Sequence, residues 1–114
     1  MTNQSEPEFT AEELRQKLNL ETGRIDWLEL QRSFARGVVI VVAPGTSLLD
    51  VGVQLSEDNR KQIEIWLEQG RIWRANDLDA KRWNESNQVF WSVVIAPWVL
   101  VQETEGEHTE EETN

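Results

Sequence analysis

The chain has 114 residues, carries a formal net charge of −10 and contains six tryptophans but no cysteine or tyrosine. Without cysteine it can form neither a disulfide nor a thiolate metal site, and its only histidine, His108, lies in an acidic C-terminal tail. The side chains that most often act as nucleophiles, proton shuttles or transition-metal ligands are therefore scarce. We expect no cofactor and no metal site.

The negative charge is concentrated at the C-terminus. Two acids precede residue 10 and six follow Gln102, so the stretch between them is close to neutral. The tail has almost no apolar side chains whose burial could offset the entropy lost on ordering. We therefore predict a disordered N-terminus over residues 1–9, one globular domain over 10–102 and a disordered acidic tail over 103–114.

The sequence also bears on location and on partners. The polar N-terminus lacks the basic and apolar regions of a signal peptide, and the longest apolar runs fall well short of the ~18 residues that a membrane span needs. We expect a cytoplasmic protein that has no contact with membranes. The acidic balance disfavours contact with phosphate backbones, which argues against nucleic acid as a partner.

Helical patterns begin the domain. Thr10 and Glu13 form a predicted capping box, which begins a helix that ends near Leu20. A second helix is expected over 26–36, because apolar residues recur there at helical spacing. Gly37 follows a cationic last turn and is the expected residue of positive φ that ends this helix.

A strand over 38–42 comes next, made of five consecutive β-branched residues. This pattern is typical of a central strand that is covered on both faces. Two more helices are predicted after it, with Ser47 and Ser56 as their N-caps. A short amphipathic strand then occupies residues 71–75.

A helix capped by Asn76 or Asp77 leads into the most hydrophobic stretch of the chain, residues 89–102. Pro97 cannot donate a hydrogen bond to a sheet, so we expect a bulge, a bend or a free edge there. The order of elements predicts an α+β domain: a small three-stranded, partly parallel sheet backed by helices in two layers.

The tryptophans include the first candidates for contact residues. Trp27, Trp66 and Trp91 fall on apolar stripes or in the strongest strand, and we assign them to the core. Trp83 has polar neighbours and Trp98 follows a proline, so either could line a groove or an oligomer interface. These two residues are the ones expected to touch a partner.

Further polar and aromatic residues are weaker candidates. Arg71 and Trp73 would share one face of a strand and could stack a nucleobase, although a snorkelling arginine beside a half-buried ring is the simpler interpretation. Asp50, Gln102 or Arg71 could supply a polar group to a ligand pocket.

Six segments occur in a recognisable order and spacing along the domain. They are Asp26-Trp27-x-x-Leu30, Phe34-Ala35-Arg36-Gly37, Leu48-Leu49-Asp50-Val51-Gly52, Asp58-Asn59, Trp66-Leu67-x-x-Gly70 and Val94 to Gln102. Together they resemble a bacterial family, the domain of unknown function number 2288. The resemblance covers about residues 11–102 and implies a bacterial cytoplasmic protein, without transferring an activity, a cofactor or a catalytic residue.

Three interpretations of the function remain open. The leading one is a non-enzymatic module that self-associates or binds a protein partner, and it predicts a contiguous exposed apolar patch. The alternative is a small-ligand-binding regulatory domain, which predicts a concave apolar pocket with a few converging polar groups. The third is an enzyme that uses carboxylates or a divalent cation, and it requires at least two of four aspartates in one cleft. These aspartates are Asp50, Asp58, Asp77 and Asp79.

Overall fold

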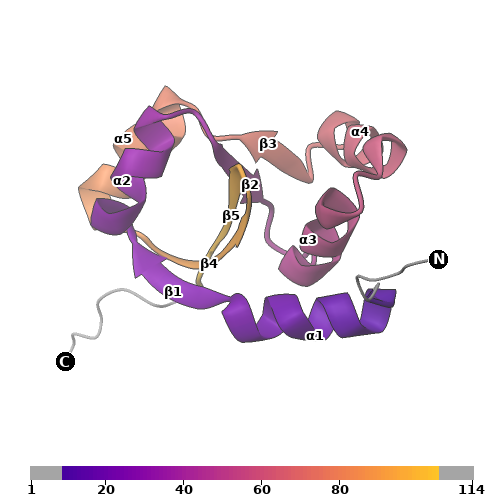
Figure 1. The fold of residues 1–114 in the computed structure, drawn as a ribbon. Coiled ribbons are helices and arrows are strands. Elements are labelled where there is room, and N and C mark those ends of the chain that lie inside the picture. The colour runs from indigo at the N-terminus through magenta and orange to yellow at the C-terminus, as the bar shows by residue number, and fades with distance from the viewer. Residues whose placement is uncertain (1–8, 106–114) are drawn as a thin grey trace.

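Five helices and five strands follow one another in the computed structural model, which describes residues 9–105 (Figure 1). The helices are α1 (Ala11–Glu21), α2 (Trp27–Ala35), α3 (Leu48–Ser56), α4 (Arg60–Glu68) and α5 (Asp77–Ser86). The strands are β1 (Gly23–Asp26), β2 (Val39–Val42), β3 (Ile72–Arg74), β4 (Val89–Ile95) and β5 (Trp98–Glu103).

The strands form one sheet in the order β1-β4-β5-β2-β3. Among the described strands, β2 and β5 run parallel and every other neighbouring pair is antiparallel. The mixed α and β composition and the partly parallel sheet are confirmed, but the expected number of three strands is wrong. The hydrophobic stretch over 89–102 is a hairpin of two strands, bent at the cis Ala96–Pro97 peptide bond. The bend expected at Pro97 is therefore present.

The other additional strand is β1, which lies between two helices and pairs with the first half of β4. Its sequence, Gly-Arg-Ile-Asp, has neither an apolar run nor a clear alternation, so local pattern does not mark it as a strand. It is formed by pairing with a partner more than 60 residues further along the chain, Gly23 opposite Ser92.

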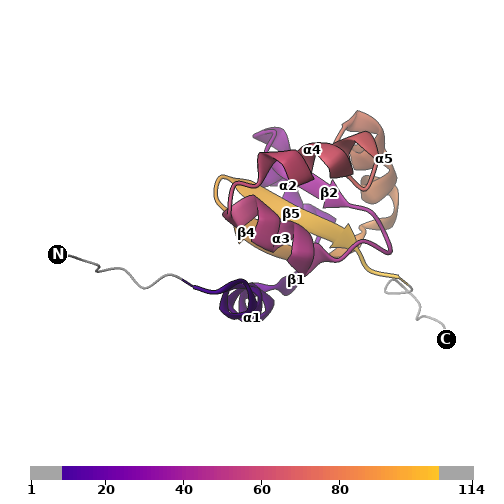
Figure 2. The same cartoon turned by 90° about the vertical axis from the view of Figure 1, so that its right-hand side faces the viewer.

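Helices cover both faces of the sheet, so the expectation of two layers is also wrong. Figure 1 places α2 and α5 on one side of the strands and α3 and α4 on the other, and Figure 2 shows α3 and α4 lying in front of the sheet. The reason lies in β2, β4 and β5, which alternate apolar side chains into two separate cores. Leu100 belongs to the core under α1, α3 and α4, and its neighbour Val101 to the core under α2 and α5.

Side-chain caps begin the helices where local sequence predicts them, with one exception. Thr10, Ser47 and Asn76 each accept a hydrogen bond from the backbone amide three residues later. Ser56 does not cap a helix but ends α3, and Asn59 is the N-cap of α4. The positive φ of Asp58, +57°, reverses the chain between the two helices and moves the start of α4 beyond the expected position.

The ordered fold continues past Gln102. Glu103 ends β5 and Thr104 is buried, with its hydroxyl and its amide both donating to the carbonyl of Val89. The domain boundary predicted after Gln102 is thus too early. The tail from residue 106 onward, including His108, and the N-terminal residues 1–8 lie outside the described residues, so the disorder predicted there stays a prediction.

Candidate functional site

A groove with a volume of about 410 Å³ lies between α3, α4 and one end of the sheet. It forms because α4 packs on α3 and on β3, while the sheet residues Ile40, Arg74 and Trp98 extend beyond the part that these helices cover. Within α4 itself no side chain is fully buried, so this helix forms a wall of the groove instead of closing it. We call this feature the α4 groove. Its lining residues are Ile40, Val51, Leu55, Asp58, Arg60, Ile63, Glu64, Leu67, Ile72, Arg74 and Trp98.

Arg74 is the most firmly placed charged group of the α4 groove. Its Nε and Nη2 both donate to the carbonyl oxygen of Gly37, at 3.2 and 2.6 Å, and its guanidinium lies 5.3 Å from the ring centroid of Trp98. These contacts use only some of its five N–H groups. Among residues 9–105, no carboxylate lies within ion-pair distance of Arg74.

The remaining charged residues of the α4 groove come from the α3–α4 connection and from α4. Asp58 and Arg60 form an exposed ion pair at 3.8 Å. Glu64 is exposed, and within the described part of the chain it forms no ion pair. The lining therefore combines a mainly apolar surface with one fixed cation, one ion pair and one separate carboxylate.

Trp98, the other predicted contact residue, lies at the surface, and its contact with a partner stays a prediction. It is half-buried, lines the α4 groove and carries the guanidinium of Arg74 over its ring. Trp83 is the opposite case: it is 0% exposed, at the centre of the core under α2 and α5. The prediction that Trp83 touches a partner is wrong, because the polar residues beside it in sequence lie on the outer face of α5 while its ring points to the sheet.

The indole of Trp83 is part of a polar network that local sequence cannot show. Its Nε1 donates to Glu103 at 2.8 Å, and Arg82 bridges Glu103 at 2.9 Å and Asp79 at 3.5 Å. The hydrogen bond that Arg82 donates to Glu103, with further attraction from the carboxylates of Glu103 and Asp79, raises the pKa of Arg82 above its usual value despite partial burial. Asp79 also accepts from Nε1 of Trp73 at 2.9 Å.

The weaker candidates do not gather in one place. Trp73 is half-buried against the core under α2 and α5, and Arg71 is exposed just before β3, outside the α4 groove. Asp50 pairs with Arg15 of α1. Gln102 donates to the carbonyls of Ala43 and Thr46, at 2.9 and 2.7 Å, and so holds the loop that leads into α3.

The three tryptophans assigned to the core differ in burial. Trp27 is buried, and its Nε1 donates to Asn84 at 3.1 Å. Trp66 is half-buried and packs against the core under α1, α3 and α4. Trp91 is 40% exposed, with the guanidinium of Arg24 at 5.4 Å from its ring centroid, so its assignment to the core is wrong. It lies on the α1 side of the sheet at a position that no helix covers fully.

The four aspartates of the enzyme interpretation occupy separate environments. Asp50 pairs with α1, Asp58 lines the α4 groove, Asp77 is in the exposed first turn of α5, and Asp79 is held by Trp73 and Arg82. Over residues 9–105 no group of three or more His, Cys, Asp or Glu side chains could hold a metal ion. A shared carboxylate cleft is therefore not formed in this part of the chain.

Sequence reasoning missed Arg74, Ile63 and Leu67 as site residues. A usable signal was present, because Ile65, Trp66 and Leu67 are three consecutive apolar residues, which is more than one narrow helical stripe can bury. In the structure Leu67 is 48% and Ile65 38% exposed, and only Leu67 lines the α4 groove. Arg74 carries no local signal, since its role comes from Gly37 and Trp98.

Comparison with known proteins adds a family and a related structure. Residues 13–103 match the family described as "Protein of unknown function (DUF2288)". The NMR solution structure of PA1075 from Pseudomonas aeruginosa is similar, with 38% sequence identity, a TM-score of 0.73, and coverage of 84% of this chain and 89% of that one. The search of curated proteins finds no match. Within the described residues, none of the helices is both long and apolar enough to cross a membrane. Because the family match spans most of the chain, the protein belongs to the DUF2288 family.

Proposed function

We propose that this domain binds a small, largely apolar ligand in the α4 groove. The observation that carries the proposal is the groove itself, a mainly apolar cavity with a volume of about 410 Å³ and a few charged groups in its lining. Ligand sites in proteins have this combination and typically measure ~300–1,000 Å³. The volume lies near the lower limit, which favours a small ligand.

The composition of the α4 groove supports binding as its role. Apolar side chains from two helices and three strands converge on it, including Ile63, Ile72 and Trp98. Each CH₂ group of a ligand that leaves water for such a surface contributes about 0.8 kcal/mol. This corresponds to a regulatory or carrier domain that responds to ligand occupancy.

A titration with 1-octanol, a neutral apolar probe, tests the proposal. We expect the amide signals of the ¹⁵N-labelled protein to shift around the α4 groove and to leave α2 and α5 unchanged. Leu67→Gln should weaken binding about fivefold or more, since it removes an apolar contact from the wall. Ile65→Gln is the matched control, because Ile65 is on the same helix, is similarly exposed and is outside the groove.

Two results would contradict this proposal. One is the absence of localised shifts up to the solubility limit of 1-octanol. The other is an equal loss of binding in Leu67→Gln and Ile65→Gln, which would mean that the alcohol associates with α4 generally and not with the groove.

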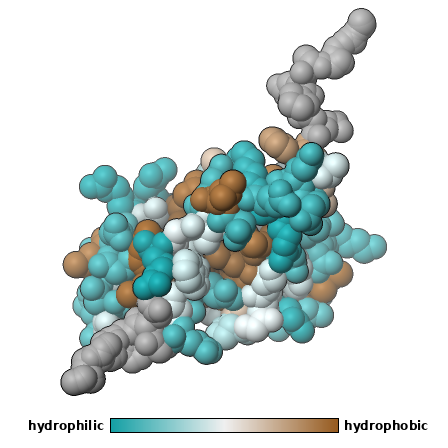
Figure 3. Space-filling model, turned by 90° about the horizontal axis from the view of Figure 1, so that it is seen from below, coloured by the Kyte–Doolittle hydropathy of each residue, from teal (hydrophilic) through white to brown (hydrophobic). Residues whose placement is uncertain are grey.

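A second candidate is a protein-interaction module that self-associates or binds a protein partner. It is favoured by exposed apolar side chains on α1 and on the neighbouring face of β4, where Leu20 and Trp91 are 86% and 40% exposed. Figure 3, a view from below, shows apolar side chains that are interspersed with hydrophilic ones on that face. Light scattering over a concentration series tests it: a stable dimer that Trp91→Ser dissociates supports this candidate, and a monomer at all concentrations argues against self-association. We also propose a cytoplasmic location, as the sequence predicts.

A further inference from the structure

We infer that the ligand of the α4 groove is a medium-chain monocarboxylate, with its carboxylate on the guanidinium of Arg74 and its alkyl chain along the apolar lining. This inference rests on the proposed function, since it names the chemical class that the same groove would take. It comes from the position and the hydrogen bonding of Arg74 and not from the apolar lining, so it can fail separately.

Arg74 is held in place before any ligand arrives. Ile40 and Arg74 are directly opposite each other in the β2–β3 pair, so both side chains lie on the face of the sheet that α3 and α4 partly cover. Two hydrogen bonds to the carbonyl of Gly37 and the ring of Trp98 orient the guanidinium plane. Its remaining N–H groups have the fork geometry that matches a carboxylate. A cation that is already oriented loses little conformational entropy on binding an anion.

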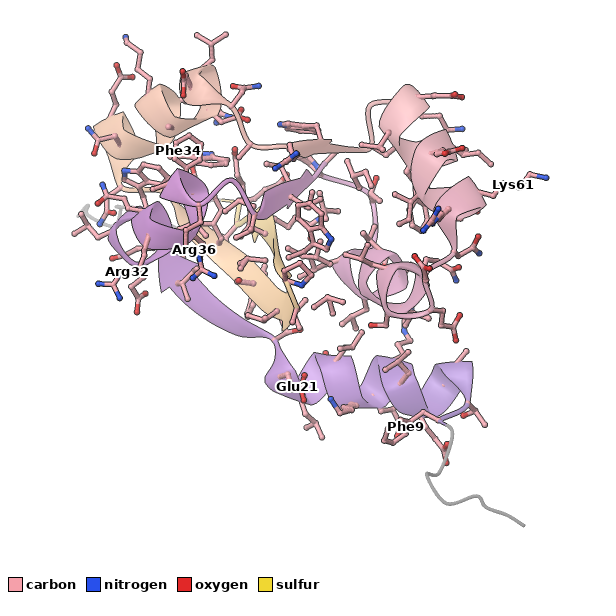
Figure 4. All side chains as sticks on the ribbon, turned by 45° about the horizontal axis from the view of Figure 1, so that its top comes forward. Phe9, Glu21, Arg32, Phe34, Arg36 and Lys61 are labelled. Atoms are coloured by element: carbon pink, nitrogen blue, oxygen red, sulfur yellow. The ribbon has the colours of Figure 1, made fainter. Side chains whose placement is uncertain are left out.

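The other charges near the α4 groove make Arg74 the main electrostatic feature. Asp58 and Arg60 offset each other as an ion pair. Lys61 is on the same helix but points away from the molecule, as Figure 4 shows, and it is not part of the lining. Glu64 is the one lining carboxylate without an ion-pair partner in the described chain, and it should repel an anionic ligand. That repulsion gives the test a second, opposite readout.

The apolar part of the α4 groove determines which alkyl chains the ligand can carry. Leu55, Ile63 and Leu67 come from the helices, and Ile40 and Ile72 from the sheet, so the lining is apolar on two sides. We therefore expect affinity to rise with chain length, by about fourfold for each added CH₂ until the groove is filled. A short hydrophilic acid such as acetate should not bind measurably.

The experiment compares octanoate, 1-octanol and octylammonium, which share an eight-carbon chain and differ in charge, on the full chain by ¹⁵N NMR titration. We expect octanoate to bind about fivefold more tightly than 1-octanol, the size of a partly exposed ion pair, and octylammonium more weakly than either. If octanoate binds no better than 1-octanol, the inference is overturned while the proposed function stands. If neither 1-octanol nor octanoate binds, both the inference and the proposed function are overturned.

Three variants then identify the charged groups involved. Arg74→Gln should remove the preference for octanoate over 1-octanol, whereas Glu64→Gln should strengthen octanoate binding about two- to threefold. Lys61→Gln removes one positive charge from the same helix and should change neither affinity. An equal effect of Lys61→Gln and Arg74→Gln would show that the preference is only a general attraction and would overturn the inference. If Arg74→Gln disturbs the backbone at Gly37, the affinity of Glu64→Gln for octanoate still tests whether the groove binds an anion.

Discussion

At the scale of single residues, the tryptophans differ by whether the indole N–H has a partner inside the fold. Trp27, Trp73 and Trp83 donate to Asn84, Asp79 and Glu103 respectively, which allows large rings to be buried without an unpaired polar group. Trp98 instead lies beside the α4 groove under Arg74. A hydrogen-bond partner for the indole N–H thus marks the three tryptophans that pack in the core under α2 and α5.

We predict that Trp83→Ala and Trp98→Ala have very different effects on stability. Trp83 is fully buried, so its removal should lower the free energy of unfolding by about 3–5 kcal/mol and leave Glu103 with one donor fewer. Trp98→Ala should cost about 1 kcal/mol or less and instead weaken binding in the α4 groove. Urea unfolding of both variants measures this difference, and equal costs would contradict the assignment of Trp98 to the groove.

Arg82 provides a prediction about pH. Its pKa is raised in the folded protein, mainly by the hydrogen bond to Glu103, so its stabilising effect is complete below the unfolded pKa and is lost only as pH rises through the higher folded value. Arg82 is also half-exposed, so we expect Arg82→Gln to cost only about 1 kcal/mol. The difference from the unsubstituted protein should stay constant between pH 7 and pH 10 in urea titrations. A difference that disappears within this range would show that the effect depends on a group that titrates there, and would contradict a contribution from the permanently charged guanidinium.

At the scale of elements, α1 is held to α3 by a close approach at Gly52. A Cβ atom at this position would lie 3.1 Å from Cδ1 of Leu18, and 3.7 Å from Cδ1 of Leu100. Gly52→Ala should be close to neutral, because the gain in helix propensity of about 1 kcal/mol offsets the small shift required of Leu18. The absence of a side chain thus sets the distance between the two helices.

A larger residue at Gly52 should separate α1 from the domain. We predict that Gly52→Val costs about 1–3 kcal/mol and increases amide exchange in α1, while the exposed Ser56→Val in the same helix costs less than about 0.5 kcal/mol. Hydrogen exchange read by NMR checks the location of the effect. An unchanged α1 in Gly52→Val would show that α1 does not depend on this contact.

At the scale of the whole molecule, two cores share one sheet. Because neighbouring residues of β5 enter opposite cores, neither core can form without the strands that also build the other. We predict that Leu30→Ala in one core and Leu100→Ala in the other each cost about 2–5 kcal/mol and each lower a single cooperative transition. Circular dichroism and tryptophan fluorescence should give coincident urea curves. A separate early transition in either variant would mean that the two cores unfold independently.

The same arrangement explains the α4 groove. The helices α3 and α4 are both only nine residues long and cannot cover the whole face of a five-stranded sheet. The uncovered end is the one that carries Ile40, Arg74 and Trp98. A binding surface thus arises from a mismatch between helix length and sheet size.

Some features of the fold could be predicted because they depend on residues that are close together in the chain. The caps at Thr10, Ser47 and Asn76, and the helix end at Gly37, are formed by contacts within a few residues, so local sequence contains the whole cause. The β-branched run in β2 similarly predicts a strand covered on both faces. The order and spacing of six short segments also indicated the family, which the match over residues 13–103 confirms.

The helices, the β2 strand, the α+β class and the scarcity of histidine and cysteine chemistry therefore follow from the amino-acid sequence alone. The burial of Trp83, the pairing of β1 and the contact between Arg74 and Trp98 at the α4 groove arise only when distant parts of the chain pack together. Each of these depends on partners 20 or more residues away, such as Glu103 for Trp83 and Gly37 for Arg74. A side chain's exposure is set by what the rest of the chain packs against it, and no local periodicity contains that information.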